Sequence, residues 1–195
     1  MTARSVAVAI AALTAALAGC GADTESSSPD TTSVETVAGA TDSPASAVAA
    51  TSVVPAEDRC TADELSLDLG RTDGSAGSVT VPLVFTNTGP RPCILYGFPG
   101  VSYVTAKDGT EVGAAATRSG SAGEPATVAP GGRATATVRA VQVENYPESE
   151  CGPTAVAGLR VYAPDDSSGL FVALPGTGCV LPGVDQLQVT SVASH

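Results

Sequence analysis

The sequence has very few of the side chains that usually carry out catalysis or bind metals. It contains no tryptophan, one methionine and one histidine among 195 residues, and the histidine is the last residue, His195. A general base must be held firmly by its surroundings, so we expect no Ser-His-Asp or Cys-His mechanism. No histidine cluster and no H-E-x-x-H, Walker A or G-x-S-x-G motif is present. We therefore expect no catalytic residue, no cofactor and no metal site.

Basic residues are also scarce: nine lysines and arginines stand against 20 acidic residues, for a formal net charge of −11. Nucleic acids and anionic lipid surfaces select basic patches, so we expect no nucleic-acid partner. Residues 21–58 contain seven acids, no base and no aromatic residue. Such a composition buries too little apolar surface to offset the entropy of ordering. We predict a disordered acidic linker over residues 20–58, with recognition of a basic partner or O-glycosylation as alternatives to a plain spacer.

The N-terminal apolar stretch is too short to span a membrane. Residues 5–18 carry no charge and follow Arg4, and only about 12–14 of them form an apolar run, against the ~20 that a transmembrane helix needs. Leu17-Ala18-Gly19-Cys20 is similar to a bacterial lipobox, in which the cysteine receives a diacylglyceryl group and becomes the new N-terminus. We predict a signal peptide over residues 1–19 and lipidation of Cys20, which anchors the chain to the membrane. The alternative is ordinary cleavage after Ala18, which releases a soluble protein.

The number of cysteines agrees with an exported, lipidated chain. Without Cys20, four of the five cysteines remain, an even number that suits disulfides in an oxidising compartment. Three pairings are open, and we favour Cys60–Cys93 with Cys151–Cys179, because each pair flanks two strands that we expect to be antiparallel neighbours. A zinc site is the alternative, but the spacings contain no C-x₂₋₄-C knuckle.

Residues 59–195 read as one β-domain. Val79, Val81, Leu83 and Phe85 alternate with more polar residues, which indicates a half-buried strand. Pro82 cannot donate a ladder hydrogen bond, so we expect this strand at an edge or with a bulge. Other strands are predicted at residues 65–69, 101–106, 111–116, 133–143, 155–162, 169–174 and 185–192. Asp108-Gly109 predicts a tight hairpin turn with positive φ angles. About eight short strands without amphipathic helices predict an all-β fold, a single antiparallel sandwich.

Two kinds of surface residue are candidates for function. Tyr96, Phe98 and Tyr103 are three of the seven aromatic residues and are close in sequence, so they are a candidate recognition patch or a buried plug at a chain corner. Acidic pairs and clusters occur in two loops, and we expect them to be solvated rather than metal ligands. Nothing in the spacing singles out a carboxylate pair for glycoside hydrolysis. The acidic loop residues are Glu144, Glu148, Glu150, Asp165 and Asp166.

Several short motifs together resemble one known family. The relevant segments are Leu65-Ser66-Leu67, Phe85-Thr86-Asn87-Thr88-Gly89, Gly97-Phe98-Pro99-Gly100-Val101-Ser102, Pro130-Gly131-Gly132-Arg133-Ala134 and the four cysteines of the domain. With these motifs the chain is similar, from Arg59 to Val192, to actinobacterial exported lipoproteins that carry the domain of unknown function numbered 4232. The resemblance implies an immunoglobulin-like β-sandwich on a lipid anchor. It implies no activity and no catalytic residue.

The sequence therefore predicts an exported lipoprotein on the extracytoplasmic side of the cell membrane. We expect a disulfide-bonded, non-catalytic binding module for an unknown protein or cell-wall partner. The alternatives are an envelope hydrolase that uses a carboxylate pair and a purely structural envelope protein.

Overall fold

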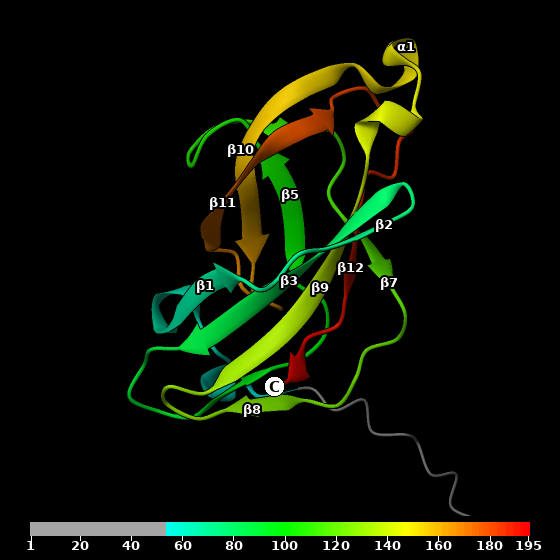
Figure 1. Ribbon diagram of the computed structural model, residues 1–195. Helices are drawn as coiled ribbons and strands as arrows, with labels where there is room; N and C mark the ends of the chain where they lie inside the picture. The colour runs from blue at the N-terminus through cyan, green and yellow to red at the C-terminus, as the bar shows by residue number, and fades with distance from the viewer. Residues whose placement is uncertain (1–53) are drawn as a thin grey trace, which may run out of the picture. The chain divides into compact units, whose positions relative to one another are not determined.

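The computed structural model describes residues 54–195, which form a β-rich domain (Figure 1). The predicted signal peptide, Cys20 and the predicted linker up to residue 53 lie outside the described residues. Within residues 54–195, no helix is long and apolar enough to cross a membrane. The helical segments are short: three 3₁₀ turns, η1 (Ala56–Asp58), η2 (Ala62–Glu64) and η3 (Val143–Asn145), and one α-helical turn, α1 (Glu148–Cys151).

The first sheet has the strand order β1-β3-β9-β12-β7, with β2 beside β3 and β13 beside β9. Its strands are β1 (Leu65–Leu69), β2 (Asp73–Ser75), β3 (Ser78–Asn87), β7 (Thr117–Ser119), β9 (Arg133–Val141), β12 (Leu187–Thr190) and β13 (Ala193–Ser194). All of its pairs are antiparallel except β12 with β7. The expectation of purely antiparallel sheets is therefore wrong at this edge. Here β7 runs parallel to a strand that comes about 70 residues later in the sequence, so no hairpin forces the two to be antiparallel.

The second sheet is fully antiparallel and has the order β11-β10-β5-β6. Its strands are β5 (Gly100–Val104), β6 (Glu111–Val112), β10 (Pro153–Tyr162) and β11 (Gly169–Cys179). A separate two-stranded sheet pairs β4 (Cys93–Leu95) with β8 (Ala126–Val128). Each of the eight predicted strands is confirmed by a strand in its range, although the ends differ by several residues at β6, β11 and β12.

One apolar core joins the two main sheets. Strand β3 contributes Leu83 and Phe85, which have no exposed surface, and β10 contributes Leu159 and Val161, which are equally buried. These side chains occupy alternate positions on their strands, because successive residues of a strand point to opposite faces. Burial of each such side chain contributes roughly 1.5–3 kcal/mol to folding.

The expected edge position of Pro82 is wrong, because β3 lies between β1 and β9. The proline is accommodated by an irregularity in the neighbouring strand. Leu69 is opposite Leu83 and Asp73 is opposite Thr80, so the β1–β2 segment advances four residues while β3 advances three. The carbonyl oxygen of Pro82 accepts a 2.8 Å hydrogen bond from the N–H of Gly70 at this point. The nitrogen of Pro82, which carries no hydrogen, faces the same side as its carbonyl, towards the β1–β2 segment. The hydrogen bonds between β3 and β9 are therefore unaffected.

The hairpin predicted at Asp108-Gly109 is present, but its turn differs from the expected one. Strands β5 and β6 pair antiparallel around it. Neither Asp108 nor Gly109 has a positive φ angle. The turn is instead closed by a hydrogen bond from the N–H of Gly109 to the carbonyl of Ala106, inside a longer loop. Because six residues separate the strands, the loop does not need a two-residue turn of mirror-image geometry.

The last residues of the range predicted as linker, from Val54 on, contact the folded domain. Val54 is 7% exposed, and its carbonyl accepts a hydrogen bond from Nε of Arg59. The guanidinium of Arg91 donates to the carbonyl oxygens of Glu57 and Arg59 and to both carboxylate oxygens of Glu64, all at 2.7–2.8 Å. This contact could not be predicted from the sequence, because Arg91 lies 32 residues after Arg59 and nothing near residue 58 indicates that the two meet.

Candidate functional site

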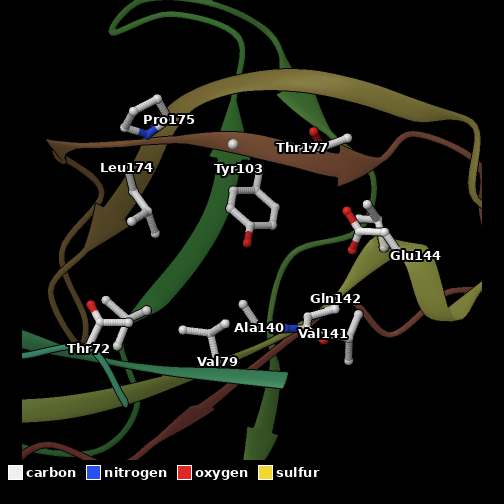
Figure 2. Close-up of a pocket in the computed structure, with 13 residues that line it drawn as sticks. Thr72, Val79, Tyr103, Ala140, Val141, Gln142, Glu144, Leu174, Pro175 and Thr177 are labelled. Carbon is white, nitrogen blue, oxygen red and sulfur yellow. The ribbon is translucent and has the colours of Figure 1, made fainter. Parts of the chain in front are cut away.

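A cleft of ≈ 340 Å³, lined mainly by apolar residues of both sheets, lies near η3 (Figure 2). Its floor comes from the first sheet, where Val79, Ala140 and Val141 face the opening. Its opposite wall comes from the second sheet, through residues 174–177 of β11 and Tyr103 of β5. The cleft therefore lies between the two sheets. A volume of this size lies within the range of ligand pockets.

Tyr103 is the polar group set deepest in this cleft. The residue is 8% exposed, and Figure 2 shows its hydroxyl pointing from the β5 side towards Val79 and Ala140. The hydroxyl has no hydrogen-bond partner in the part of the chain that the structure describes. Burial raises the pKa of the phenol above its usual value of 10.0, so the group stays protonated and can donate a hydrogen bond. A hydroxyl that points into a cleft and has no partner among the described residues is available to a bound molecule.

Two further hollows continue the cleft around the same end of the domain. The first has a volume of ≈ 330 Å³ and shares Val143, Glu144 and Thr177 with the cleft. The second, of ≈ 390 Å³, shares Tyr146 with the first and reaches Leu181. The three hollows are neighbours through these shared lining residues, and together we call them the groove.

The groove combines apolar walls with charge of one sign. Its charged lining residues are Glu144, Glu148 and Glu150, and no lysine or arginine lines it. Leu181, one of the two large hydrophobic residues with notable exposure in the described chain, is 40% exposed in its wall, and its neighbour Val180 is 46% exposed. The acidic loop that the sequence predicts to be simply solvated therefore borders an apolar depression. Sequence alone could not show this, because the apolar walls come from segments up to about 100 residues apart.

The structure separates the three aromatic residues of the predicted recognition patch. Tyr96 and Phe98 are half-buried and line a different hollow with Arg118 and Asp165, whereas Tyr103 lines the cleft. The guanidinium carbon of Arg118 lies 5.5 Å from the centre of the Phe98 ring, a cation–π contact. Residues that are close in the sequence thus line two different hollows, and of the three aromatic residues only Tyr103 lines the groove.

The carboxyl groups with displaced pKa values have structural partners outside the groove. Burial raises the pKa of Asp166, but hydrogen bonds from the backbone N–H groups of Ser168 and Ala62 outweigh it and lower the pKa. The pKa of Glu64 is also lowered. Burial raises this pKa, but hydrogen bonds from the Thr61 backbone and from Arg91 stabilise the carboxylate and outweigh burial. A lowered pKa suits an ion-pair partner rather than a general acid. Within residues 54–195, no three acidic, cysteine or histidine side chains are grouped so that they could hold a metal ion.

A disulfide fixes the far end of the groove. The structure joins Cys151 to Cys179 and Cys60 to Cys93, which is the pairing favoured from the sequence. Cys151 ends α1, and Cys179 ends β11 immediately before the exposed Val180 and Leu181. The bond therefore ties together the two segments that carry the outer wall of the groove. The other disulfide lies at the corner where the chain enters the domain.

Comparison with protein families matches residues 60–193 to the family described as "Domain of unknown function (DUF4232)". The chain belongs to this family. No curated protein matches the chain in a sequence comparison. The matched range includes all four paired cysteines and nearly all of the β-rich domain.

Proposed function

We propose that this DUF4232 protein is a lipid-anchored, non-catalytic binding module that takes up its partner in the groove. The observation that carries the proposal is the apolar cleft between the sheets with the unpartnered hydroxyl of Tyr103 inside it. Such a combination of apolar walls and a few convergent polar groups is typical of binding sites. The partner in this proposal is a protein or a component of the cell wall.

The location is part of the same proposal. Cys20 carries the lipid, residues 1–19 are removed, and the linker holds the domain on the extracytoplasmic side of the cell membrane. Two buried disulfides support an oxidising compartment. An immunoglobulin-like relationship is also part of the proposal, and the common core of two β-sheets supports it. Intact-mass measurement of membrane-extracted protein should give an acylated Cys20, and Cys20→Ala should leave the membrane. An unmodified N-terminus at Gly19 would contradict the anchor.

A groove-blocking variant tests the binding role. Thr177 is exposed, lies on the edge strand β11 and lines two of the three hollows, so Thr177→Trp should fill the groove without disturbing the core. Thr127 is an equally exposed threonine on β8, which pairs only with β4, and Thr127→Trp is the matched control. In crosslinking pull-downs from envelope fractions, the wild type and the control should capture the same partner and Thr177→Trp should lose it. Equal capture by all three would refute binding in the groove.

A further inference from the structure

We infer that the occupant of the groove is an extended peptide segment in which apolar side chains alternate with lysine or arginine. The inference rests on the proposed function and adds the chemistry of the partner. In an extended chain, successive side chains point to opposite sides. One set can therefore enter the apolar walls while the other set meets the carboxylates along the rim.

The charge of the groove selects a cationic segment. Three acids line the groove: Glu144, Glu148 and Glu150, which lie within a stretch of seven residues that contains Tyr146. All three are exposed, and no basic side chain lines the groove to neutralise them. Like-charge repulsion disfavours an acidic ligand, and the same field excludes nucleic acid. A peptide with two or three basic side chains complements this rim.

The hydroxyl of Tyr103 provides an independent argument for a ligand in the cleft. The side chain of Tyr103 is 8% exposed, its hydroxyl points into the cleft, and no group of the described chain accepts the hydroxyl proton. A peptide carbonyl that enters the cleft beside an apolar side chain supplies the missing acceptor. Glu144 also lines the cleft, so the cleft offers both a hydrogen-bond donor and an anion.

The wall of the cleft suits an extended backbone. Leu174, Pro175, Gly176 and Thr177 form it, and they belong to β11, whose only strand partner among the described residues is β10. An edge strand presents backbone groups that can pair with an added peptide. Pro175 lacks an N–H and limits pairing with another copy of the same edge. The three linked hollows then receive successive side chains of one segment, which a compact small molecule would not fill.

Binding of short peptides to the full chain in detergent tests this inference. The probe is a fluorescein-labelled Gly-Leu-Lys-Leu-Lys-Leu-Lys-Gly peptide, and fluorescence anisotropy reports binding. One control peptide has Glu in place of Lys, and the other has Ser in place of Leu. We expect the Leu/Lys peptide to bind at least about tenfold more tightly than either control, with affinity falling as salt rises.

Variants locate the interaction. The triple variant Glu144→Gln, Glu148→Gln, Glu150→Gln should weaken binding of the Leu/Lys peptide by about tenfold. Its matched control is Asp68→Asn, Asp108→Asn, Glu124→Gln, which removes three exposed acids elsewhere and should change binding less than about twofold. Tyr103→Phe should weaken it by roughly three- to tenfold. Unfolding midpoints of all variants identify any that fail to fold.

The outcomes separate this inference from the proposed function. Equal binding of the three peptides, or equal effects of the two triple variants, would overturn the cationic peptide. If Thr177→Trp still abolishes capture of a cellular partner in that case, the groove remains a binding site with a different ligand. If Thr177→Trp captures normally, the proposed function fails as well.

Discussion

Removing the Cys151–Cys179 disulfide should impair the groove, whereas removing Cys60–Cys93 should cost the same stability and leave the groove intact. The proposed comparison is Cys151→Ala, Cys179→Ala against Cys60→Ala, Cys93→Ala. All four cysteines are at most 2% exposed, so each double variant loses two buried sulfur atoms as well as the crosslink. The two changes are therefore chemically matched and differ in position.

The expected loss of stability follows from the length of chain that each bond closes. The sequence separations are 28 residues for Cys151–Cys179 and 33 for Cys60–Cys93. In the chain-entropy description, loops of these lengths contribute about 3.6 and about 3.7 kcal/mol to the free energy of unfolding. Because the dependence on length is logarithmic, the two double variants should be nearly equal in stability.

The effect on binding should differ because the bonds lie in different places. Without Cys151–Cys179, α1 and residues 180–184 lose their crosslink and are held together only by backbone hydrogen bonds such as that from the N–H of Leu181 to the carbonyl of Cys151. These segments carry Glu148, Glu150 and Leu181. Urea unfolding under non-reducing conditions measures stability, and anisotropy with the Leu/Lys peptide measures binding at a temperature where both variants are folded. Unchanged binding in the Cys151→Ala, Cys179→Ala variant would refute the role of this bond in shaping the groove. A stability difference above about 2 kcal/mol would refute the entropic reasoning.

Three other predictions concern stability and pH. Gln186→Leu should lower the free energy of unfolding by about 3 kcal/mol in urea titrations, because three buried hydrogen bonds of its amide are lost. Glu64→Gln should destabilise the domain above pH 4.5 and much less below it. The pKa of Glu64 is lower in the folded protein than its unfolded value of 4.5, so the carboxylate paired with Arg91 stabilises the fold above that pH. This stability is lost as the pH falls and the carboxylate is protonated. Gly70→Ala should lower the thermal midpoint, at a cost of about 1–3 kcal/mol, because a Cβ at this position lies 2.8 Å from Cβ of Pro82.

Each of these predictions has a matched control. Gln188→Leu replaces a half-buried glutamine two residues from Gln186 and should change stability by no more than about 0.5 kcal/mol. Glu124→Gln removes an exposed acid outside this ion pair and should change stability by no more than about 0.5 kcal/mol. Gly74→Ala adds a Cβ with no atom within 4 Å and should be tolerated. Controls as damaging as their partners would contradict the contacts invoked for Gln186, Glu64 and Gly70.

The long strands could be predicted from the sequence because their residues alternate over many positions. Strand β3 shows this most clearly, with buried Val81, Leu83 and Phe85 at every second residue. The three-residue strands β2, β4, β7 and β8 could not be predicted, since three residues do not establish a period. β2 and β7 are also exposed throughout, so they carry no burial pattern at all. Their place in the sheet depends on partners elsewhere in the chain.

The groove could be predicted only in fragments. The sequence pointed to Tyr103 and to the acidic residues around Tyr146, but as separate features with ordinary explanations. Their combination depends on Val79 and on Leu174, which reach the same cleft from two different sheets. Such juxtapositions arise from the packing of the sheets and leave no local pattern. The disulfide pairing was predictable because each pair of cysteines flanks two antiparallel neighbours, β1 with β3 and β10 with β11.

Site-specific photo-crosslinking in intact cells tests the central claim most directly. A photoreactive amino acid is placed at Thr177 in the groove or at Thr127 on β8, in otherwise identical full-length chains. The account predicts a discrete crosslinked partner from position 177 and none from position 127. The crosslink from position 177 should be lost in a chain that also carries Tyr103→Phe and the three glutamine substitutions of the rim. The same crosslinks from both positions, or none from position 177, would contradict the claim that the groove binds the partner.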